Sequence, residues 1–531
     1  LAKLSNLVPG GGIWMNTQRP EWNDANNALA GYGLSVVTLC YLRRHLHFLA
    51  GLMRGMEEGR VPISAEVVEW MDRVGSVLEG QAGESRRKTV DALGGAFSDY
   101  RQRVYESGLS GRRETGYSEL ASFFELALKA VDHSIEENRM ESGLYHSYNI
   151  LNFEGQEGEI AVGRLYEMIE GQVAALSSGV LGPGETSAML GALFGSDIYR
   201  EDQHSFMLYP RRELPSFMDR NIVPEDRVMN IRLLVDMLER GEGSLIQRDS
   251  GGVLRFNGDL SNARDIETVL DRLAEDPDWS DMVEQDRGAV FEVFESVFRH
   301  RSFTGRSGTM YGYEGIGCIY WHMISKLLLA VQEVTVRTFR AGASDGSRDS
   351  LAEYYYRVRS GLSFEKTARE YGAFPTDPYS HTPLHSGAQQ PGMTGQVKEE
   401  IITRFGELGL VVDGGIVSFD PVILRAEEFL ELPETFEYFD TGGKRRSIEL
   451  QPGSLAFTFC QVPVIYKTGG EGKRIRVTAA SGDVTERQGS SLDREESRSI
   501  FRRTGAIERI DVVIDPGALL VRQDPLRSWQ L

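Results

Sequence analysis

The spacing of the apolar residues changes near residue 410, and this change divides the chain into two kinds of structure. Upstream, apolar residues recur every three to four positions over many segments, which predicts amphipathic helices. We expect these helices over residues 27–53, 65–80, 86–108, 117–139, 158–179, 225–242, 263–276, 289–301, 316–342 and 396–409. A loop-rich stretch is expected over 182–215, and a short hairpin over 244–258 that turns at residues 249–252.

Downstream of residue 410 the apolar runs are short, rich in β-branched and aromatic residues, and separated by Gly, Pro and Asp. They cover residues 409–424, 447–470, 473–482 and 507–517. This texture is typical of strands joined by turns. We therefore predict a mainly α chain with a helical region at 1–410 and a C-terminal antiparallel β-domain at 411–531.

The upstream helices occur in pairs joined by polar, glycine-rich loops. This order favours an (α/α)6-type toroid whose loops gather at one end. The first residue is Leu1, and the chain begins close to its most polar motif. We therefore expect a fragment that lacks an N-terminal part, with an incomplete toroid.

Charge and cysteine usage exclude several classes of protein. A formal net charge of −20 argues against a nucleic-acid partner, and no run of about 20 apolar residues is present to span a membrane. Cys40, Cys318 and Cys460 are too scattered for disulfides or a thiolate metal site, so we expect buried free thiols. His45 and His47 point to different faces of one helix, and we predict no required metal.

The first polar loop, residues 11–31, carries indole, amide, guanidinium and carboxyl groups without a helical period. Trp22 offers an apolar face to a sugar ring, while Asn23, Arg19 and Glu21 offer hydrogen-bonding groups to its hydroxyls. A carboxyl beside an indole in a dry pocket has a raised pKa, which suits Asp24 to act as a general acid. The alternative is that Asp24 or Asn23 caps a helix beginning near Ala25, and both interpretations stay open.

The second polar loop, residues 374–400, precedes a helix expected to start near Gly395 with Thr394 as its N-cap. The free N–H groups of a helix start, with a neighbouring histidine, suit an anion such as phosphate. An ordinary threonine cap is the alternative. The candidate side chains of this loop are Tyr379, His381, His385, Gln389, Gln390 and Thr394, with Gly395 allowing close approach.

The third polar loop, residues 299–322, contains Tyr313 and Glu314, which are candidates for a saccharide subsite. Trp321 is alternatively plain core on the following helix, and His322 has a structural role. Residues 143–153 form a further aromatic segment with a histidine and asparagines, for which a packed loop is the favoured interpretation.

Two of these motifs resemble glycoside hydrolase family 94, the inverting cellobiose and chitobiose phosphorylases. The segment PEWNDANNAL resembles the WNDxxN segment of that family, with Glu21 where the family usually has Asp. The segment PGMTGQVKEEIITRFGELGL, followed by DGGIVSFDPVI, resembles its Thr-Gly phosphate element and the lead into its β-domain. The resemblance implies an (α/α)6 barrel, with Asp24 as general acid and Trp22 in the glycosyl subsite. It also implies phosphate binding by Thr394 and Gly395, with His385 and His381 as the candidate histidines.

The function implied by the resemblance is inverting phosphorolysis of a β-linked glucoside or oligosaccharide to an α-sugar 1-phosphate. Inorganic phosphate is the co-substrate, with no metal or organic cofactor, and keeping a sugar phosphate inside the cell favours the cytoplasm. The related phosphorylases are commonly dimers, so the resemblance allows a homodimer. One alternative is an inverting hydrolase or transglycosylase, in which Glu314, or next Glu399, activates water. Another is a glycan-binding protein without turnover.

Overall fold

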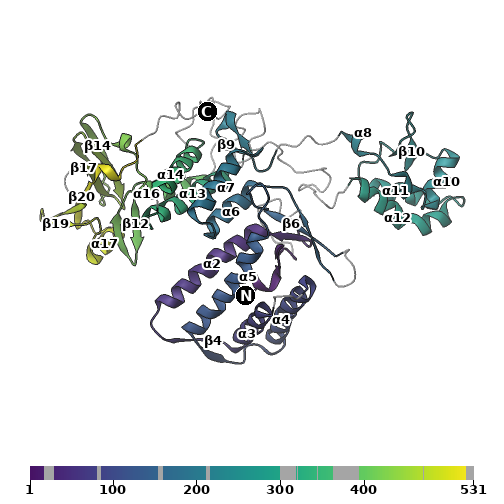
Figure 1. Cartoon of the computed structure of the whole chain (residues 1–531), viewed down its shortest axis with the longest axis horizontal. Helices are drawn as coiled ribbons and strands as arrows, with labels where there is room; N and C mark the ends of the chain where they lie inside the picture. Colours follow the sequence, from purple (N-terminus) through teal and green to yellow (C-terminus); the bar gives the residue numbers. More distant parts are fainter. Residues whose placement is uncertain are drawn as a thin grey trace. The chain divides into compact units, whose positions relative to one another are not determined.

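The computed structural model describes residues 1–16, 29–80, 85–153, 159–210, 216–298, 319, 321–343, 345–362, 394–469 and 472–521, with the backbone alone at 345 and 394–397. The chain divides into two compact units, and Figure 1 labels helices and strands of both. Unit 1 comprises Leu1–Ala174, Ser196–Ile198 and Met207–Cys318, and unit 2 comprises Ala175–Gly195, Tyr199–Phe206 and Ile319–Leu531. The predicted boundary between domains at residue 410 stays a prediction.

The described residues before 154 in unit 1 contain two pairs of packed helices. They are α2 (Val36–Gly55) with α5 (Tyr117–Glu136), and α3 (Ala65–Glu79) with α4 (Arg86–Ser107). The sequence predicted α3 and α4 almost to the residue from the three-to-four spacing of their apolar residues. The Ser85 hydroxyl accepts from the Lys88 N–H at 3.3 Å and so caps α4. Strands β4 (Arg60–Ser64), which connects α2 to α3, and β5 (Arg112–Gly116), which connects α4 to α5, pair antiparallel.

A five-stranded sheet in unit 1 was not predicted. Its order is β1 (Leu7–Val8), β2 (Gly12–Trp14), β3 (Gly33–Ser35), β6 (Tyr148–Asn152) and β7 (Ala161–Arg164). Two expected helices were therefore wrong in part. Helix α2 begins only at Val36, since Gly31 adopts φ +94° and β3 pairs with β2 and β6. The helix expected over 158–179 is confined to α6 (Ile169–Ser178), because β7 pairs with β6.

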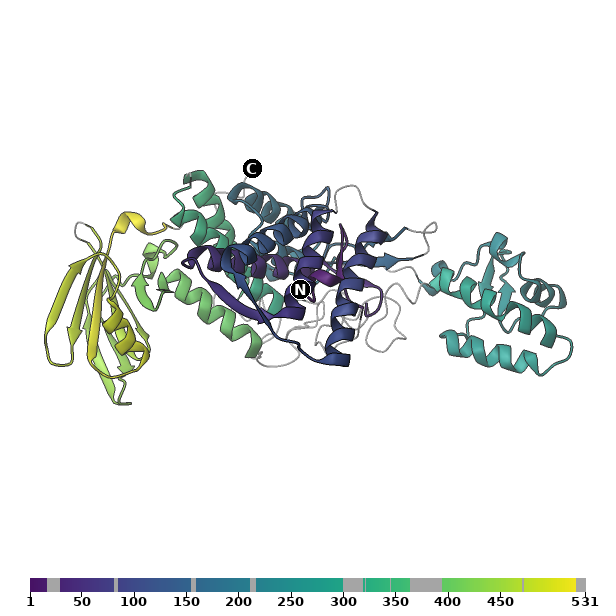
Figure 2. The same cartoon turned by 90° about the horizontal axis from the view of Figure 1, so that it is seen from below.

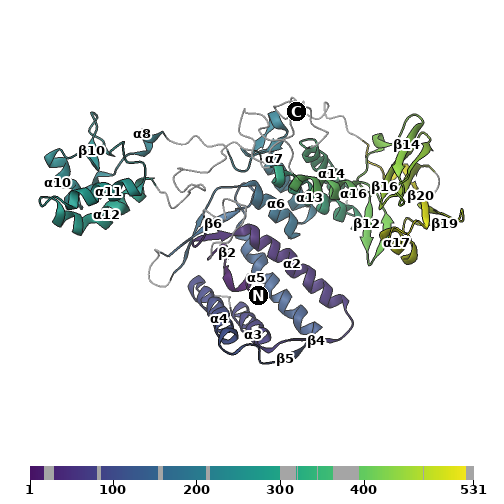
Figure 3. The ribbon, with the colours of Figure 1, turned by 180° about the vertical axis from the view of Figure 1, so that it is seen from behind.

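Residues 216–298, whose longer helices are labelled in Figure 3, form a segment that has a hydrophobic core of its own. The helices are α8 (Phe217–Arg220), α9 (Glu225–Val228), α10 (Arg232–Arg240), α11 (Ala263–Ala274) and α12 (Ser280–Phe298). Strands β10 (Ile246–Arg248) and β11 (Leu254–Phe256) confirm the predicted hairpin, whose turn is closed by N–H bonds from Gly251 and Val253 to Asp249 Oδ1. The core collects Leu234, Met237, Ile246, Phe256, Ile266, Leu270, Trp279 and Phe294, among others.

The helical part of unit 2 contains α7 (Pro183–Phe194), α13 (Trp321–Arg340), α14 (Asp345–Arg359) and α16 (Thr394–Glu407), with α13 packed against both α14 and α16. A short strand pair, β8 (Tyr199–Arg200) and β9 (Ser205–Phe206), lies in the same unit. The loop expected over 182–215 was wrong for α7. Pro183 is well suited to the first turn of a helix, and the Gly182 N–H donates to Glu185 Oε2 at 2.9 Å.

The C-terminal part of unit 2 is β-rich, as predicted. The pairs β12 (Leu410–Asp413) with β13 (Ile416–Phe419) and β14 (Glu434–Phe439) with β15 (Arg445–Leu450) are hairpins. A five-stranded sheet follows, in the order β16 (Ser454–Phe459), β17 (Val462–Thr468), β20 (Ile507–Ile514), β18 (Arg474–Ala479) and β19 (Val484–Gln488). Helix α17 (Arg494–Phe501) packs on it (Figure 2). The expected all-antiparallel arrangement was wrong, because β17 and β20 pair parallel.

The described helices are thus followed by a C-terminal sheet region, which agrees with a helical region and a β-domain. A closed ring of helices stays a prediction. Cys40 is a fully buried free thiol, as expected, and burial raises its pKa to about 12. Cys460 is free but only partly buried, and Cys318 lies outside the described residues.

Candidate functional site

The first polar loop is held at both of its ends by the sheet of unit 1. Its candidate residues Arg19, Glu21, Trp22, Asn23 and Asp24 lie in 17–28, outside the described residues. The flanking backbone is closed by bonds from the Met15 N–H to the Gly33 carbonyl at 2.9 Å and from the Gly31 N–H to the Met15 carbonyl at 2.6 Å. The described residues on the two sides of 17–28 are therefore hydrogen-bonded to each other beside β2 and β3.

An aromatic cluster packs beside these loop ends. Leu29, Tyr148, Met168 and Tyr209 are its buried members, and Met15, Tyr32, Val37, Leu165, Tyr166 and Leu208 pack against them. Tyr166 and Tyr209 meet edge to face, with ring centroids 6.0 Å apart. Burial raises the pKa of Tyr32. The loop that carries Asp24 is thus joined at Met15 and Leu29 to a closely packed apolar base.

A buried asparagine pair fixes the glycine-rich turn that leads into β2. Asn138 Nδ2 donates to the Gly10 carbonyl at 3.2 Å, and Asn149 Nδ2 donates to the Gly11 carbonyl at 2.7 Å. Asn138 Oδ1 accepts from Asn149 at 2.7 Å and from the guanidinium of Arg164. Both asparagines are fully buried. The loop expected over 143–153 was wrong for β6, which pairs with β3 and β7, but the segment is packed as expected, because Asn149 is fully buried.

The second polar loop ends at α16. Tyr379, His381, His385, Gln389 and Gln390 lie in 363–393, outside the described residues. Thr394 and Gly395 are the first two residues of α16, so the helix begins within one residue of the predicted start, and Thr394 is its first residue instead of the N-cap that precedes it. Their backbone is placed and their side chains are not described. The phosphate site itself stays a prediction.

Helix α16 buries a polar stripe instead of an apolar one. Glu399, Thr403 and Glu407, spaced four residues apart, are 5%, 0% and 1% exposed, whereas Ile401 and Ile402 are each 50% exposed. This reverses the usual arrangement of a surface helix. A buried polar stripe requires partners on the helices that face it.

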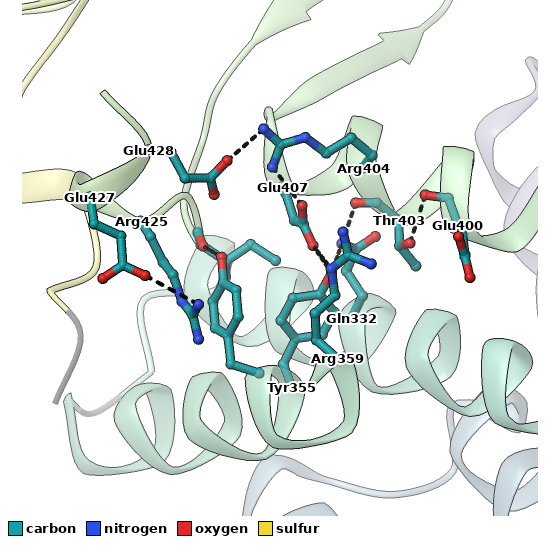
Figure 4. A network of polar contacts seen from close by, with 12 residues as sticks. Gln332, Tyr355, Arg359, Glu400, Thr403, Arg404, Glu407, Arg425, Glu427 and Glu428 are labelled. Carbon is teal, nitrogen blue, oxygen red and sulfur yellow. Dashed lines mark hydrogen bonds and ion pairs between the residues drawn. The ribbon is translucent and has the colours of Figure 1, made fainter. Parts of the chain in front are cut away.

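Glu407 has three partners, two on α14 and one on its own helix (Figure 4). Its carboxylate accepts from the Tyr355 hydroxyl at 2.5 Å, from Arg359 Nε at 2.9 Å and from an Arg404 guanidinium nitrogen at 2.7 Å. The side chains of Arg359 and Glu407 are only 5% and 2% exposed. Burial and the adjacent Glu407 charge raise the pKa of Tyr355 well above its usual range, so the phenol remains a donor. The buried carboxylate is fully compensated by α14 and by its own helix.

Gln332 of α13 completes the network (Figure 4). Its Nε2 donates to the Tyr355 hydroxyl at 3.0 Å and to the Thr403 carbonyl at 2.7 Å. These bonds tie α13, α14 and α16 into one hydrogen-bonded group. We call Gln332, Tyr355, Arg359, Arg404 and Glu407 the α16 network.

The α16 network continues into the C-terminal β region. Arg404 also pairs with Glu428 at 2.5 Å, in the 3-10 helix Ala426–Glu428. The Arg425 guanidinium lies 3.6 Å from the ring centroid of Tyr356, whose hydroxyl donates to the Ile423 carbonyl at 2.6 Å. The Tyr466 hydroxyl donates to the Leu408 carbonyl, just beyond α16. The end of α16 is therefore held by the β region as well as by helices.

The third polar loop falls largely outside the described residues, including Tyr313 and Glu314. Trp321 is fully buried at the start of α13, which confirms the core alternative for this residue. Glu399, the second carboxylate considered for hydrolysis, is buried on α16. Its Oε2 finds no hydrogen-bond donor in the part of the chain that the structure describes, and Lys398 lies 3.7 Å from Oε1.

The sequence did not reveal the α16 network. The one available signal was the recurrence of polar residues at 399, 403 and 407, which by itself predicts a solvated helix face. The described His, Cys, Asp and Glu side chains contain no group of three or more arranged to hold a metal ion. No described helix has the length and apolar character needed to cross a bilayer.

Comparison with known proteins identifies one part of the chain. A search of curated protein sequences with the whole chain found no match. Residues 214–301, which nearly coincide with the segment 216–298 that has its own core, match the family model described as GH149 phosphorylase insertion domain 2. This match covers a minor part of the chain. It supports a relationship to the glycoside phosphorylases, and hence an enzyme of carbohydrate metabolism.

Proposed function

We propose that this protein is an inverting glycoside phosphorylase that cleaves a β-linked glucoside or oligosaccharide with inorganic phosphate. The observation that carries the proposal is the match of residues 214–301 to a phosphorylase insertion domain. The WND motif and the Thr-Gly helix start support it from outside that segment. The product is an α-sugar 1-phosphate, formed without metal or organic cofactor in the cytoplasm.

In this mechanism Asp24 protonates the glycosidic oxygen as the bond to the anomeric carbon breaks. Phosphate attacks that carbon from the opposite face, so a single protein carboxyl suffices and the anomeric configuration inverts. Trp22 stacks on the sugar ring. The hydroxyls are bound by Arg19, Glu21, Asn23, Tyr313, Glu314, Tyr379, Gln389 and Gln390.

Phosphate is bound in this proposal by Thr394 and Gly395 with His385 and His381. The free N–H groups and the positive dipole end of α16 favour an oxyanion at its first turn. A glycine at the second position of the helix leaves its backbone N–H accessible to a phosphate oxygen. Position 395 is such a glycine.

The test is product analysis with the full chain. We would incubate it with β-linked glucosyl disaccharides and oligosaccharides, with and without phosphate, and follow products by ³¹P and ¹H NMR. The expected result is phosphate-dependent formation of an α-anomeric sugar 1-phosphate. Release of free sugar at the same rate without phosphate contradicts phosphorolysis.

Inverting hydrolysis is the second candidate, and Glu399 favours it. A hydrolase needs a second carboxylate to activate water. Glu399 is a buried carboxylate on α16, and its Oε2 has no donor among the described residues. The same NMR experiment separates the two functions. Inverting hydrolysis of a β-linked substrate releases the free sugar as its α-anomer, whereas phosphorolysis forms the α-sugar 1-phosphate.

A further inference from the structure

The polar stripe of α16 is a costly way to hold a helix in place. A buried ion pair such as Arg359 with Glu407 is seldom more stable than apolar residues of the same volume. The helix does carry large apolar side chains, but Ile401 and Ile402 lie half exposed instead of filling the buried face. The arrangement therefore calls for an explanation other than stability.

Hydrogen bonds fix the position and orientation of a helix more strictly than apolar packing does. A helix packed by leucines can slide or tilt by small amounts, whereas hydrogen bonds tolerate little change in distance or angle. The α16 network constrains translation and rotation at once, because its bonds reach α13, α14 and the 3-10 helix Ala426–Glu428 from different directions.

We propose that Glu407, Arg404 and Gln332 are positioning residues that hold the start of α16 in place for phosphate. This inference rests on the proposed function, in which Thr394 and Gly395 bind phosphate. Glu407 is thirteen residues beyond Thr394 on the same helix. At about 1.5 Å per residue the two lie about 20 Å apart along the axis, so a tilt of about 5° at Glu407 moves the helix start by nearly 2 Å. A misplacement of about 1 Å in a reacting group is enough to cost up to ~100-fold in rate.

Arg404 extends this role to the C-terminal region. Its guanidinium bonds Glu407 on its own helix and Glu428 in the 3-10 helix. Glu428 follows the β12–β13 hairpin and precedes the large sheet. The β region thus braces the helix that carries the phosphate-binding pair.

The first experiment compares Glu407→Gln with Glu437→Gln. Glu437 pairs with Arg445 at 2.5 Å on an exposed hairpin, with side chains 53% and 68% exposed, so it receives the same chemical change without a buried network. Glu407→Gln is expected to raise KM for phosphate about tenfold while KM for the saccharide changes less than twofold. The control leaves both values unchanged. Equal increases in the two KM values, or no increase in a folded variant, overturn the proposal.

Arg404→Gln provides a second route if Glu407→Gln does not fold. The Arg404 side chain is 35% exposed, so its removal disturbs the core less than that of Glu407. The expected KM change has the same direction and is about threefold. If Arg404→Gln leaves the KM for phosphate unchanged, the proposal that the Arg404–Glu428 contact holds α16 in place is wrong.

Hydrogen exchange separates failure of this inference from failure of the proposed function. Glu407→Gln is expected to speed amide exchange at residues 396–402 at least tenfold relative to Glu437→Gln. This readout needs no substrate. If the wild type shows no phosphate-dependent turnover, the proposed function fails while the exchange result still tests positioning. Unchanged exchange at these amides overturns positioning whatever the enzyme binds.

Discussion

The side-chain amide of Gln332 fills the space beside Gly406. A methyl group at position 406 would overlap the carbon, oxygen and nitrogen of that amide. The amide cannot turn away freely, because its Nε2 donates both to the Tyr355 hydroxyl and to the Thr403 carbonyl. Gly406 is thus required by the polar contact between α13 and α16.

Gly406→Ala is expected to destabilise unit 2 by about 1–2 kcal/mol. Alanine in a helix interior gains up to about 1 kcal/mol over glycine, but displacing the amide leaves buried polar groups unsatisfied at about 1–3 kcal/mol each. Urea unfolding would measure the change. Gly95→Ala on α4, where nothing lies within 4 Å of the new methyl group, is the control and should be neutral or stabilising. Equal behaviour of the two variants would contradict the packing argument.

Asp24→Asn is expected to abolish phosphorolysis while leaving the fold intact. Removing a general acid typically lowers the rate about 10²–10⁴-fold. The measurement is initial-rate formation of sugar phosphate at saturating substrate, with circular dichroism to confirm folding. Asp278→Asn, at an exposed position of the segment 216–298, is the control. Wild-type turnover by Asp24→Asn would assign the carboxyl to a helix cap.

Glu399→Gln is expected to retain phosphorolysis within about threefold of the wild-type rate. In this reaction phosphate is the nucleophile, so no second carboxylate has to activate water. Loss of about 10²-fold or more would instead identify Glu399 as the general base of a hydrolase. Rates with and without phosphate, measured on the same preparation, decide between these outcomes.

Because of Glu66, the free energy of unfolding is expected to depend on pH in the acidic range. The hydroxyl and backbone N–H of Ser110, with the Ser64 hydroxyl, donate to its carboxylate and lower its pKa from 4.5 to about 2. A lowered folded-state pKa contributes stability that is complete above the unfolded-state pKa and is lost as pH falls toward 2.

Comparison of wild type with Glu66→Gln tests this expectation. The difference in unfolding midpoint should be largest at pH 7 and should shrink between pH 4.5 and 2, the window set by the two pKa values. Glu69→Gln, on the same helix but exposed and paired with Arg103, should change the midpoint little at any pH. A Glu66→Gln difference that is constant with pH would show that its hydrogen bonds do not favour the charged form.

Local signals in the sequence predicted the local structure. Helices α3, α4 and α11 and the β10–β11 hairpin were expected where they occur, because their caps, apolar stripes and turn residues lie within a few positions of one another. Strand β3 was mistaken for helix because its partners β2 and β6 decide its conformation. The α16 network was not predictable, since Gln332 and Thr403 are 71 positions apart and Tyr355 and Glu407 are 52 apart.

For the candidate site, too, the sequence indicated the local features but not the contacts between distant segments. The sequence named three polar loops from their composition, and the structure describes the ends of the first loop and the helix that follows the second. The residues proposed to act in them lie mainly outside the described ranges, so their roles stay predictions. Loop conformation depends on contacts between distant segments, which a periodic pattern does not encode.

The place of β20 in the large sheet has a consequence for biosynthesis. This strand lies between β17 and β18, and it alone joins the β16–β17 hairpin to the β18–β19 hairpin. Neither hairpin can complete its pairing until residues 507–514 have left the ribosome. A premature stop codon shortly upstream would leave two open strand edges, which are templates for aggregation, even though both hairpins had already been synthesised.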